Sequence, residues 1–359
     1  MYRSFTTQQE LEMPRHPHPH IEEILDRNAA RVIAHYEERH IRREYFAQHP
    51  FHYIYVGCMD GRTSHLPQTF GIPVGCAEFF QTGGAMFDIG WKYFSNLLTE
   101  SIQFGLTKKR TVVILVSSHF SGHYPNHGCR AFENDRRAAR TYVLRLARDI
   151  RYAVEPYGGD VHVLPIEFDT DDDSVILYGE TGRVDTSHFL SSECGLKEVL
   201  YDSFPSYVDS DMGEELHTLV HNNIEHVHSV LRNRRDHTAC SHCETTLLVG
   251  RGAGTWLNPH RNAGIILFPE GERLDTFIVT AGKILQSNAN RDKILQKHGA
   301  VIMPCSAYGD RRNERFAIAR VKAYQQIIER LFAQHLPDLH YTLFPATVDL
   351  TTWQLTALG

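Results

Sequence analysis

Runs of apolar residues alternate with amphipathic stretches through the first half of the chain. Residues Ile21 to Phe46 repeat apolar positions at near-helical spacing, whereas His52 to Gly57 is a continuous apolar run that predicts a buried strand. Asp88 to Leu106, with Asp88 as N-cap, predicts another helix, and the β-branched run Thr111 to Val116 predicts a central strand. A further helix and strand follow at Phe132–Ala153 and Asp160–Ile166. This alternation predicts an α/β fold built on a parallel sheet.

Other segments of the first half interrupt this alternation. The prolines between Arg15 and His20 predict a flexible His/Pro-rich tail over residues 1–20. The acidic run Asp169–Asp173 lacks the glycine and glutamate of a calcium loop, so it predicts a solvated turn. Residues 174–186 predict an inserted hairpin, and residues 187–212, which show no periodicity, predict an irregular connector.

The order of predicted elements recurs in the second half of the chain. At an offset of 193 residues, Ile54–Gly57 aligns with Leu247–Gly250, and each copy has a preceding amphipathic helix. The further matches are Gly71 with Gly264, Val112–Leu115 with Ala300–Met303, and Pro165 with Pro345. Their common order predicts a tandem duplication, with one α/β unit over residues 21–186 and a second over residues 213–359.

Composition limits the classes of partner. The net charge of −6 over 359 residues offers no basic field for nucleic acid, and no apolar run reaches the roughly 20 residues of a membrane span. We therefore expect a soluble, cytoplasmic protein with no nucleic-acid or membrane partner. Seven cysteines are too few and too irregularly placed for a disulfide framework, while 23 histidines favour metal binding.

Candidate chemistry gathers at the ends of two predicted strands. The first strand runs into Cys58-Met-Asp60-Gly-Arg62, which combines a soft metal ligand, a carboxylate and a guanidinium. The carboxyl ends of parallel strands are where open α/β sheets build their sites. The strand ending at Val116 runs into a loop that contains three histidines and Cys129.

Zinc in catalytic sites takes three protein ligands and keeps one position open, so Cys58, one histidine and Cys129 would form a Cys₂His set. Among the histidines we favour His119, because it directly follows the strand, with His127 and then His123 as alternatives. A single loop histidine is about as often a partner of the backbone as a ligand, which keeps the three alternatives open.

The second copy lacks these groups. Arg251, Ala253 and Thr255 stand where the first copy has Cys58, Asp60 and Arg62, and Ala307 stands where it has His119. The second copy therefore predicts a degenerate unit without a metal site. A separate cluster that includes Cys240 and Cys243 is a candidate second metal or redox site, with a plain loop as the alternative.

In these motifs the chain resembles the β-class carbonic anhydrases. That family has Cys-x-Asp-x-Arg after its first strand, a glycine turn, which Gly83 and Gly84 match, and then a strand ending in histidine with a cysteine soon after. Nine residues separate His119 from Cys129, whereas most members have two. The longer loop, the Asp-Gly-Arg variant and the degenerate second copy resemble the carboxysomal branch. The resemblance implies a tandemly duplicated fold that forms an intramolecular pseudo-dimer.

The resemblance also implies an activity: zinc-dependent reversible hydration of carbon dioxide to bicarbonate and a proton by zinc-bound hydroxide. The chain would then be a carbonic anhydrase, a zinc lyase also called carbonate dehydratase, whose cofactor is Zn²⁺. Asp60 would orient the hydroxide, Arg62 would hold Asp60 off the metal, and His123 or His127 would export the proton.

Two alternatives remain open. One is a hydrolase for carbonyl sulfide or carbon disulfide on the same fold. The other is a non-catalytic, zinc-stabilised scaffold associated with a shell. The resemblance further suggests homo-oligomers of pseudo-dimers and a location within a bacterial microcompartment.

Overall fold

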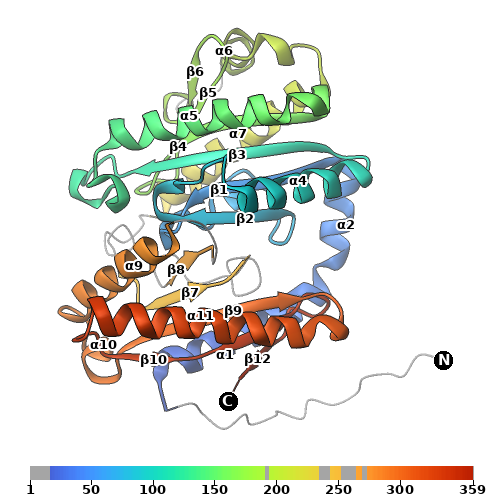
Figure 1. The fold of residues 1–359 in the computed structure, drawn as a ribbon. Coiled ribbons are helices and arrows are strands. Elements are labelled where there is room, and N and C mark those ends of the chain that lie inside the picture. Colours follow the sequence, from blue (N-terminus) through green and yellow to red (C-terminus); the bar gives the residue numbers. More distant parts are fainter. Residues whose placement is uncertain (1–16, 191–193, 234–242, 252–263, 269–272, 359) are drawn as a thin grey trace.

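The computed structural model describes residues 17–190, 194–233, 243–251, 264–268 and 273–358. These residues form two β-sheets with helices packed on their faces (Figure 1). The fold is mixed α/β with parallel-rich sheets, as the hydrophobic pattern predicts. Within the described residues, no helix combines the length and the apolarity needed to span a bilayer.

The first sheet has the strand order β2-β1-β3-β4-β5-β6, in which β2, β1, β3 and β4 are parallel. Alternate residues of β1 enter different cores: Tyr53 and Tyr55 face one cluster, and Ile54 and Val56 face the other. Burial on both faces explains why β1 is a continuous apolar run. The strands are β1 (Phe51–Cys58), β2 (Ala77–Thr82), β3 (Thr111–Phe120), β4 (Val161–Asp169), β5 (Val175–Tyr178) and β6 (Arg183–Asp185).

Helices cover both faces of this sheet. The helices α4 (Lys92–Thr107) and α5 (Arg136–Val154) pack in the cluster that contains Ile54 and Val56. The cluster around Tyr53 and Tyr55 contains the helices α6 (Leu196–Ser203) and α7 (Asp211–Arg232), together with the first residue of the short helix α3 (Leu66–Thr69).

The second sheet has the order β12-β11-β9-β7-β8, and β10 pairs with β9 beside β11. One face packs against α9 (Leu274–Ala289) and α11 (Glu314–His335), and α10 (Lys293–His298) lies next to α9. The strands are β7 (Thr246–Val249), β8 (Gly264–Leu267), β9 (Ala300–Tyr308), β10 (Tyr341–Leu343), β11 (Ala346–Asp349) and β12 (Leu355–Ala357).

The pairing registers of the two sheets correspond from the edge strands β2 and β8 as far as β5 and β12, whereas β6 has no counterpart among the described residues of the second sheet. Val56 pairs with Val116 in the first sheet, and Val249 pairs with Pro304 in the second. Ile166 pairs with Leu177 where Ala346 pairs with Ala357, so β12 occupies the place of β5. The match of Pro165 with Pro345 agrees with this register.

One predicted match is wrong. Tyr53 pairs with Ala77 and Thr246 pairs with Gly264, so the counterpart of Gly264 is Ala77 rather than Gly71. The connection that leads to the edge strand is shorter in the second half than in the first, and a constant offset of 193 residues cannot represent that difference.

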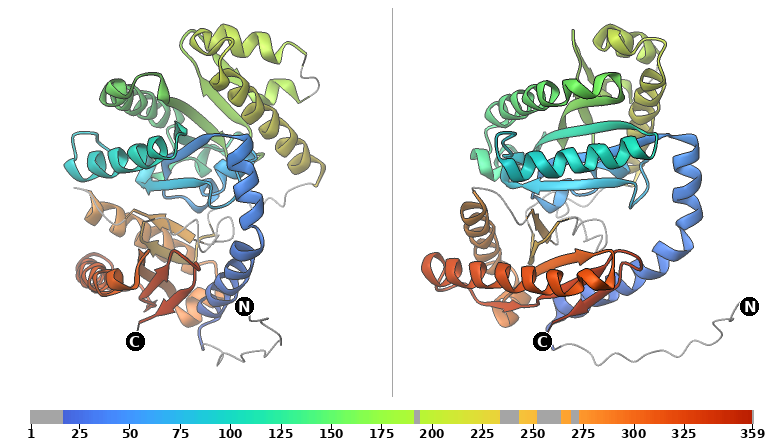
Figure 2. Two further views of the ribbon diagram at one scale, coloured as in Figure 1. Left: turned by 90° about the vertical axis from the view of Figure 1, so that its right-hand side faces the viewer. Right: turned by 45° about the vertical axis from the view of Figure 1, so that its right-hand side comes forward.

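The helix that precedes each sheet in the sequence packs on the other sheet. Ile21 and Ile24 of α1 (Pro19–Glu37) lie in one core with Leu248 of the second sheet. Conversely, Leu216 and other residues of α7, which precedes the second sheet, lie in the core of the first. Figure 2 shows α1 beside the C-terminal strands and α7 beside the first sheet. Each half therefore depends on the other for part of its core.

The edge strands β2 and β8 bring the two sheets together. Ile266 donates a backbone hydrogen bond to the carbonyl of Met59 at 2.9 Å, and Phe268 donates one to Gln81 at 2.7 Å. Cys58, Met59 and Cys129 share a core cluster with residues of the second half such as Leu247. The carboxyl end of β1 is therefore buried between the two halves.

Several boundaries differ from the sequence prediction. The helix predicted over residues 21–46 is broken at Glu38 into α1 and α2 (Arg39–Gln48). The break arises because α1 packs on the second sheet, whereas Tyr45 and Phe46 of α2 pack on the first. Asp88 is not the N-cap of α4, since its side chain accepts from Gly90 N at 2.7 Å instead.

Two further segments are more ordered than predicted. The connector 187–212 contains α6. The acidic segment is not a solvated turn, because Asp169, Asp171 and Asp173 are buried. The hairpin prediction is confirmed by the antiparallel pairing of β5 with β6.

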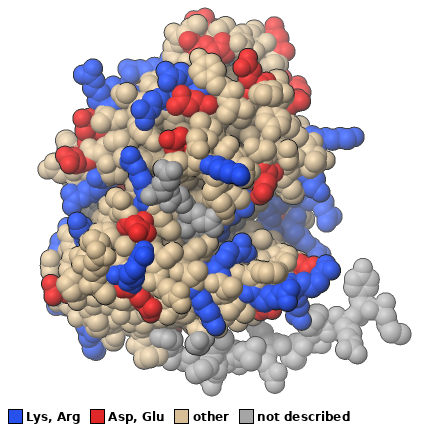
Figure 3. Space-filling model, viewed as in Figure 1, with Lys and Arg blue, Asp and Glu red and all other residues tan. Residues whose placement is uncertain are grey.

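On the face drawn in Figure 3, basic and acidic side chains are interspersed.

Candidate metal centre

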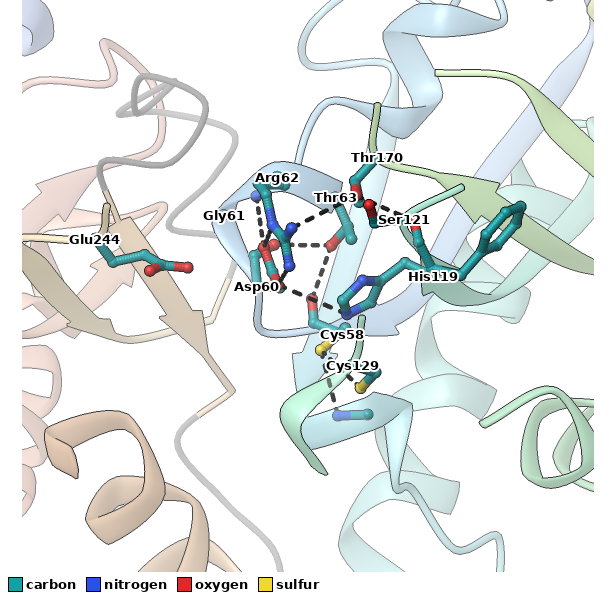
Figure 4. Close-up of polar contacts among 12 residues, drawn as sticks. Cys58, Asp60, Gly61, Arg62, Thr63, His119, Ser121, Cys129, Thr170 and Glu244 are labelled. Carbon is teal, nitrogen blue, oxygen red and sulfur yellow. Dashed lines mark hydrogen bonds and ion pairs between the residues drawn. The ribbon is translucent and has the colours of Figure 1, made fainter. Parts of the chain in front are cut away.

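Adjacent strands of the first sheet position two of the predicted ligands. Cys58 is the last residue of β1, and His119 lies in β3, which runs parallel to β1 and continues to Phe120 rather than stopping at Val116. Cys129 precedes a 3₁₀ helix (Arg130–Phe132) in the loop that follows β3. The three side chains converge below the Asp60–Arg62 pair (Figure 4).

Cys58, His119 and Cys129 could hold a metal ion. They are all buried, and one ligand atom from each lies within 4.8 Å of the others. The two sulfurs are 3.8 Å apart, too far for a disulfide. Two thiolates at about 2.3 Å from one tetrahedral zinc ion would lie roughly 3.8 Å apart, so the donor set fits zinc.

His119 also fits a ligand role. It is 2% exposed, and neither of its ring nitrogens has a hydrogen-bond partner among the described residues. An unpaired buried imidazole nitrogen costs about 1–3 kcal/mol. A metal ion at this position would remove that penalty at one nitrogen.

The pKa shifts of Cys58 and His119 favour a bound cation at this site. Contact with Cys129, together with burial, raises the pKa of the Cys58 thiol well above its ordinary value. Burial lowers the pKa of His119, but the neighbouring Cys58 and Asp60 raise it by more. A bound metal ion deprotonates coordinating thiols, so it would reverse the effect on Cys58.

Backbone and side-chain groups around Cys58 hold it in place. Gly84 donates its N–H to the sulfur at 3.3 Å, and Gln81 Nε2 donates to the Cys58 carbonyl at 3.0 Å. Gly84 has a φ of +62°, and a Cβ there would come within 2.5 Å of Phe132. The glycine turn that the sequence singles out therefore donates a hydrogen bond to the thiol, a role that spacing alone could not reveal.

Asp60 and Arg62 form a buried two-point ion pair. Arg62 Nε donates to Asp60 Oδ1 at 3.0 Å and Nη2 donates to Oδ2 at 2.7 Å. Asp60 Oδ2 lies 3.7 Å from His119 Nε2, so the carboxylate borders the ligand cluster. Burial opposes the charge on Arg62, but Asp60, with help from Glu244, raises its pKa further.

Glu244 belongs to the second half and was not predicted from the sequence. It is 1% exposed, extends toward the Asp60–Arg62 pair in Figure 4, and accepts from Asn288 Nδ2 at 3.3 Å. It lies just before β7 and carries no motif, so only the packing of the two halves identifies it.

The alternative histidines do not join the cluster. The His123 side chain is 75% exposed, and its Nδ1 contacts Asp171 Oδ2 at 3.1 Å. His127 stacks on Tyr124 with ring centroids 5.2 Å apart. Of the three predicted histidines, only His119 lies with both cysteines.

The second sheet presents different groups at the corresponding positions. The registers place Arg251 at the position of Cys58 and Ala307 at that of His119. Arg251 points toward Glu78, with 3.5 Å between Nη2 and Oε2. A cavity of about 1120 Å³ lies here and is lined by Arg251, Ala307 and Arg320, among others. Ala253 and Thr255 lie outside the described residues.

The structure does not test the other predicted cysteine site. Cys240 lies outside the described residues, and Cys243 is exposed just before β7. The candidate metal or redox site at Cys240 and Cys243 therefore stays a prediction.

Comparison with known families places this centre in context. The family model of the carboxysome shell carbonic anhydrase catalytic domain matches residues 41–226, more than half of the chain. The match includes Cys58, Asp60, Arg62, His119 and Cys129 and ends before Glu244. No significant match to a curated protein is found. The chain belongs to the carboxysome shell carbonic anhydrase family.

Proposed function

We propose that this chain is a zinc-dependent carbonic anhydrase that interconverts carbon dioxide and bicarbonate. The observation that carries the proposal is the buried Cys58–His119–Cys129 group with the Asp60–Arg62 pair beside it. A purely structural zinc site has no need for a buried acid–guanidinium pair at its edge. Membership of the family supports the same activity.

A zinc ion held by Cys58, His119 and Cys129 would supply hydroxide at neutral pH, because zinc lowers the pKa of a bound water toward about 7. Asp60 Oδ2 faces the ligand cluster and would accept a hydrogen bond from the attacking oxygen. Arg62 occupies both carboxylate oxygens from the opposite side, which keeps Asp60 ionised and away from the ligand position. His123, exposed beyond the end of β3, would pass the proton to buffer.

We further propose that the two halves are diverged copies joined as an intramolecular pseudo-dimer. The matching strand orders and the helices exchanged between the sheets support this proposal. The catalytic unit would be residues 21–186 and the degenerate unit residues 213–359, with residues 187–212 between them. The degenerate unit would serve the active one by covering it, since Phe277 packs against Gly83 beside Cys58. The family also supports association with a carboxysome shell in a bacterial microcompartment.

Stopped-flow carbon dioxide hydration combined with zinc analysis tests the activity. We expect the wild-type chain to be active with zinc bound, Cys58→Ala to lose both zinc and activity, and Asp60→Ala to keep zinc but lose activity. Cys76→Ala is the matched control, because Cys76 is another buried cysteine that lies outside the ligand cluster.

A wild-type chain with a full complement of zinc and no hydration activity would overturn the proposal. The same preparation is then assayed with carbonyl sulfide and carbon disulfide, and turnover of either would identify a hydrolase on this fold. A zinc-loaded chain that turns over none of the three would indicate a scaffold.

A further inference from the structure

A second cluster of ligand-type side chains is separate from the cysteine–histidine cluster and shares no residue with it. It consists of His65, which immediately precedes α3, Asp173 in the turn between β4 and β5, and His226 on α7. His65 Nε2 lies 3.1 Å from Asp173 Oδ2, and His226 Nε2 lies 2.9 Å from the same oxygen. Three segments that are distant in the sequence thus aim one ligand atom each at a common point.

The fold fixes the orientation of the carboxylate. Asp173 is 0% exposed and has a φ of +68°, and its N–H donates to Asp169 O at 3.0 Å. Its carbonyl accepts from Asn223 Nδ2 at 3.0 Å, and Asn223 also donates to Thr69 Oγ1 at 3.1 Å. The same asparagine of α7 therefore holds the turn and α3 together around the cluster.

The two imidazoles are held but accessible. The His65 ring packs against Phe168 of β4 in a T-shaped arrangement, with centroids 5.7 Å apart and planes 76° apart. The side chains of His65 and His226 are 24% and 32% exposed, so one side of the cluster opens toward solvent. A cation could enter from that side, and water could complete its coordination.

We infer that His65, Asp173 and His226 form a second metal site, for a divalent transition-metal ion such as Zn²⁺. Two imidazoles and one carboxylate are a donor set that zinc uses while keeping a position open to water. Donors bound at about 2.0–2.1 Å from one tetrahedral ion lie roughly 3.3 Å apart, so the nitrogen–oxygen separations of 3.1 and 2.9 Å need to widen by only a few tenths of an ångström to admit an ion. The carboxylate also offsets one of the two positive charges.

The site would brace the surroundings of Arg62. His65 follows Arg62 by three residues, and Thr170, three residues before Asp173, lies with its Oγ1 3.5 Å from Arg62 Nη1. A metal ion here would tie both of these segments to α7. This inference does not depend on the proposed activity, because the two sites share no ligand.

Cobalt titration of the full-length, metal-free chain tests the inference. Every protein in this test, including the reference called wild type here, carries Cys240→Ala and Cys243→Ala, which removes the other candidate metal site. We expect two Co²⁺ ions to bind per wild-type chain, with a thiolate-to-cobalt charge-transfer band from the Cys58–His119–Cys129 site alone. The Cys58→Ala/Cys129→Ala variant should lose that band and keep one cobalt ion. His226→Ala should keep the band and lose the other ion.

His228→Ala is the matched control, because His228 lies on the same helix and its Nε2 contacts Leu190 O at 2.6 Å. It should bind two ions. His65→Ala provides a second test if His226→Ala does not fold. Binding of one cobalt ion per wild-type chain, or of two by both His226→Ala and His65→Ala, would overturn the inference and leave a hydrogen-bonded trio. Anomalous diffraction from cobalt-soaked wild-type crystals should show a peak among the three side chains.

Discussion

Arg62 donates to both oxygens of Asp60 while its own side chain is completely buried. The pair lies between the cysteine–histidine cluster and Glu244 of the second half, so both halves of the chain shape its surroundings (Figure 4). Because a buried charge that loses its partner is strongly destabilising, neither member can be altered without a consequence for the site.

Arg62→Lys should lower kcat/KM by about 10- to 100-fold while zinc remains bound, because one ammonium cannot reproduce the two-point contact that orients Asp60. Stopped-flow assays with metal analysis measure both quantities. The matched control is Arg312→Lys, since Arg312 also pairs with an aspartate two residues earlier, with Nε and Nη2 both on Oδ2 of Asp310, but is 89% exposed. Equal effects of the two substitutions would contradict an orienting role for Arg62.

His119→Ala should lose zinc and reduce the hydration rate by more than about 100-fold, beyond the loss expected for a group that only supports a ligand. His127→Ala should keep zinc and full activity, because His127 stacks on Tyr124 away from the cluster. Zinc retention by His119→Ala together with loss from His127→Ala would reassign the histidine ligand.

His123→Ala should keep zinc but turn over more slowly in weak buffer, with the rate restored by added imidazole. The expectation follows from the 75% exposure of the side chain beyond β3. Steady-state rates measured across a series of buffer concentrations provide the test. A rate that does not depend on buffer in either protein would remove His123 from proton export.

Local sequence patterns predicted the strands and the two cysteines of the cluster more accurately than they predicted the residues around the site. Tyr53 to Val56 are buried on both faces of the sheet, so their apolar run is visible in the sequence itself. The end of β3 is not visible in this way, because Ser117, Ser118 and His119 are polar residues that β4 pairs and buries. That pairing depends on residues about 50 positions away.

The burial of the acidic segment Asp169–Asp173 also could not be predicted from the local sequence. Asp171 is buried because Ser121 and the backbone of His123 donate to it, and Asp173 because His65 and His226 reach it. Five consecutive acidic or polar residues predict a solvated turn when such distant partners are unknown. Glu244 escaped prediction for the same reason, since its importance depends on how the two halves pack.

Gly84→Ala should weaken zinc binding by about 10- to 100-fold, because a Cβ would collide with Phe132 and move the N–H that contacts Cys58 Sγ. Gly195→Ala is the control: Gly195 also has a positive φ, +81°, but a Cβ there meets nothing within 4 Å. Both variants should lose about 1–2 kcal/mol of stability from backbone strain. Competition with a chelator measures zinc affinity, and equal affinities in the two variants would rule out a specific role for the Gly84 N–H.

Asp169→Asn should change how stability depends on pH. Burial, opposed by the N–H groups of Asp171 and Gly122 but aided by the charges of Asp172 and Asp171, raises the pKa of Asp169 to about 7. Between its ordinary value near 3.8 and 7, the folded chain then binds more protons than the unfolded chain. The contribution of Asp169 to the free energy of unfolding is therefore fully present below about pH 4 and is lost as the pH rises through 7.

The size of this effect follows from about 1.4 kcal/mol per pKa unit, which gives a loss of a few kcal/mol across the window. The asparagine variant should not show this loss. The unfolding free energy of the variant should therefore rise relative to that of the wild type between pH 4 and pH 8. Urea unfolding at several pH values measures that difference. Asp149→Asn, which removes a carboxylate of α5 whose side chain is 38% exposed, is the matched control. A variant with the same slope as the wild type would show that Asp169 is ionised throughout this range.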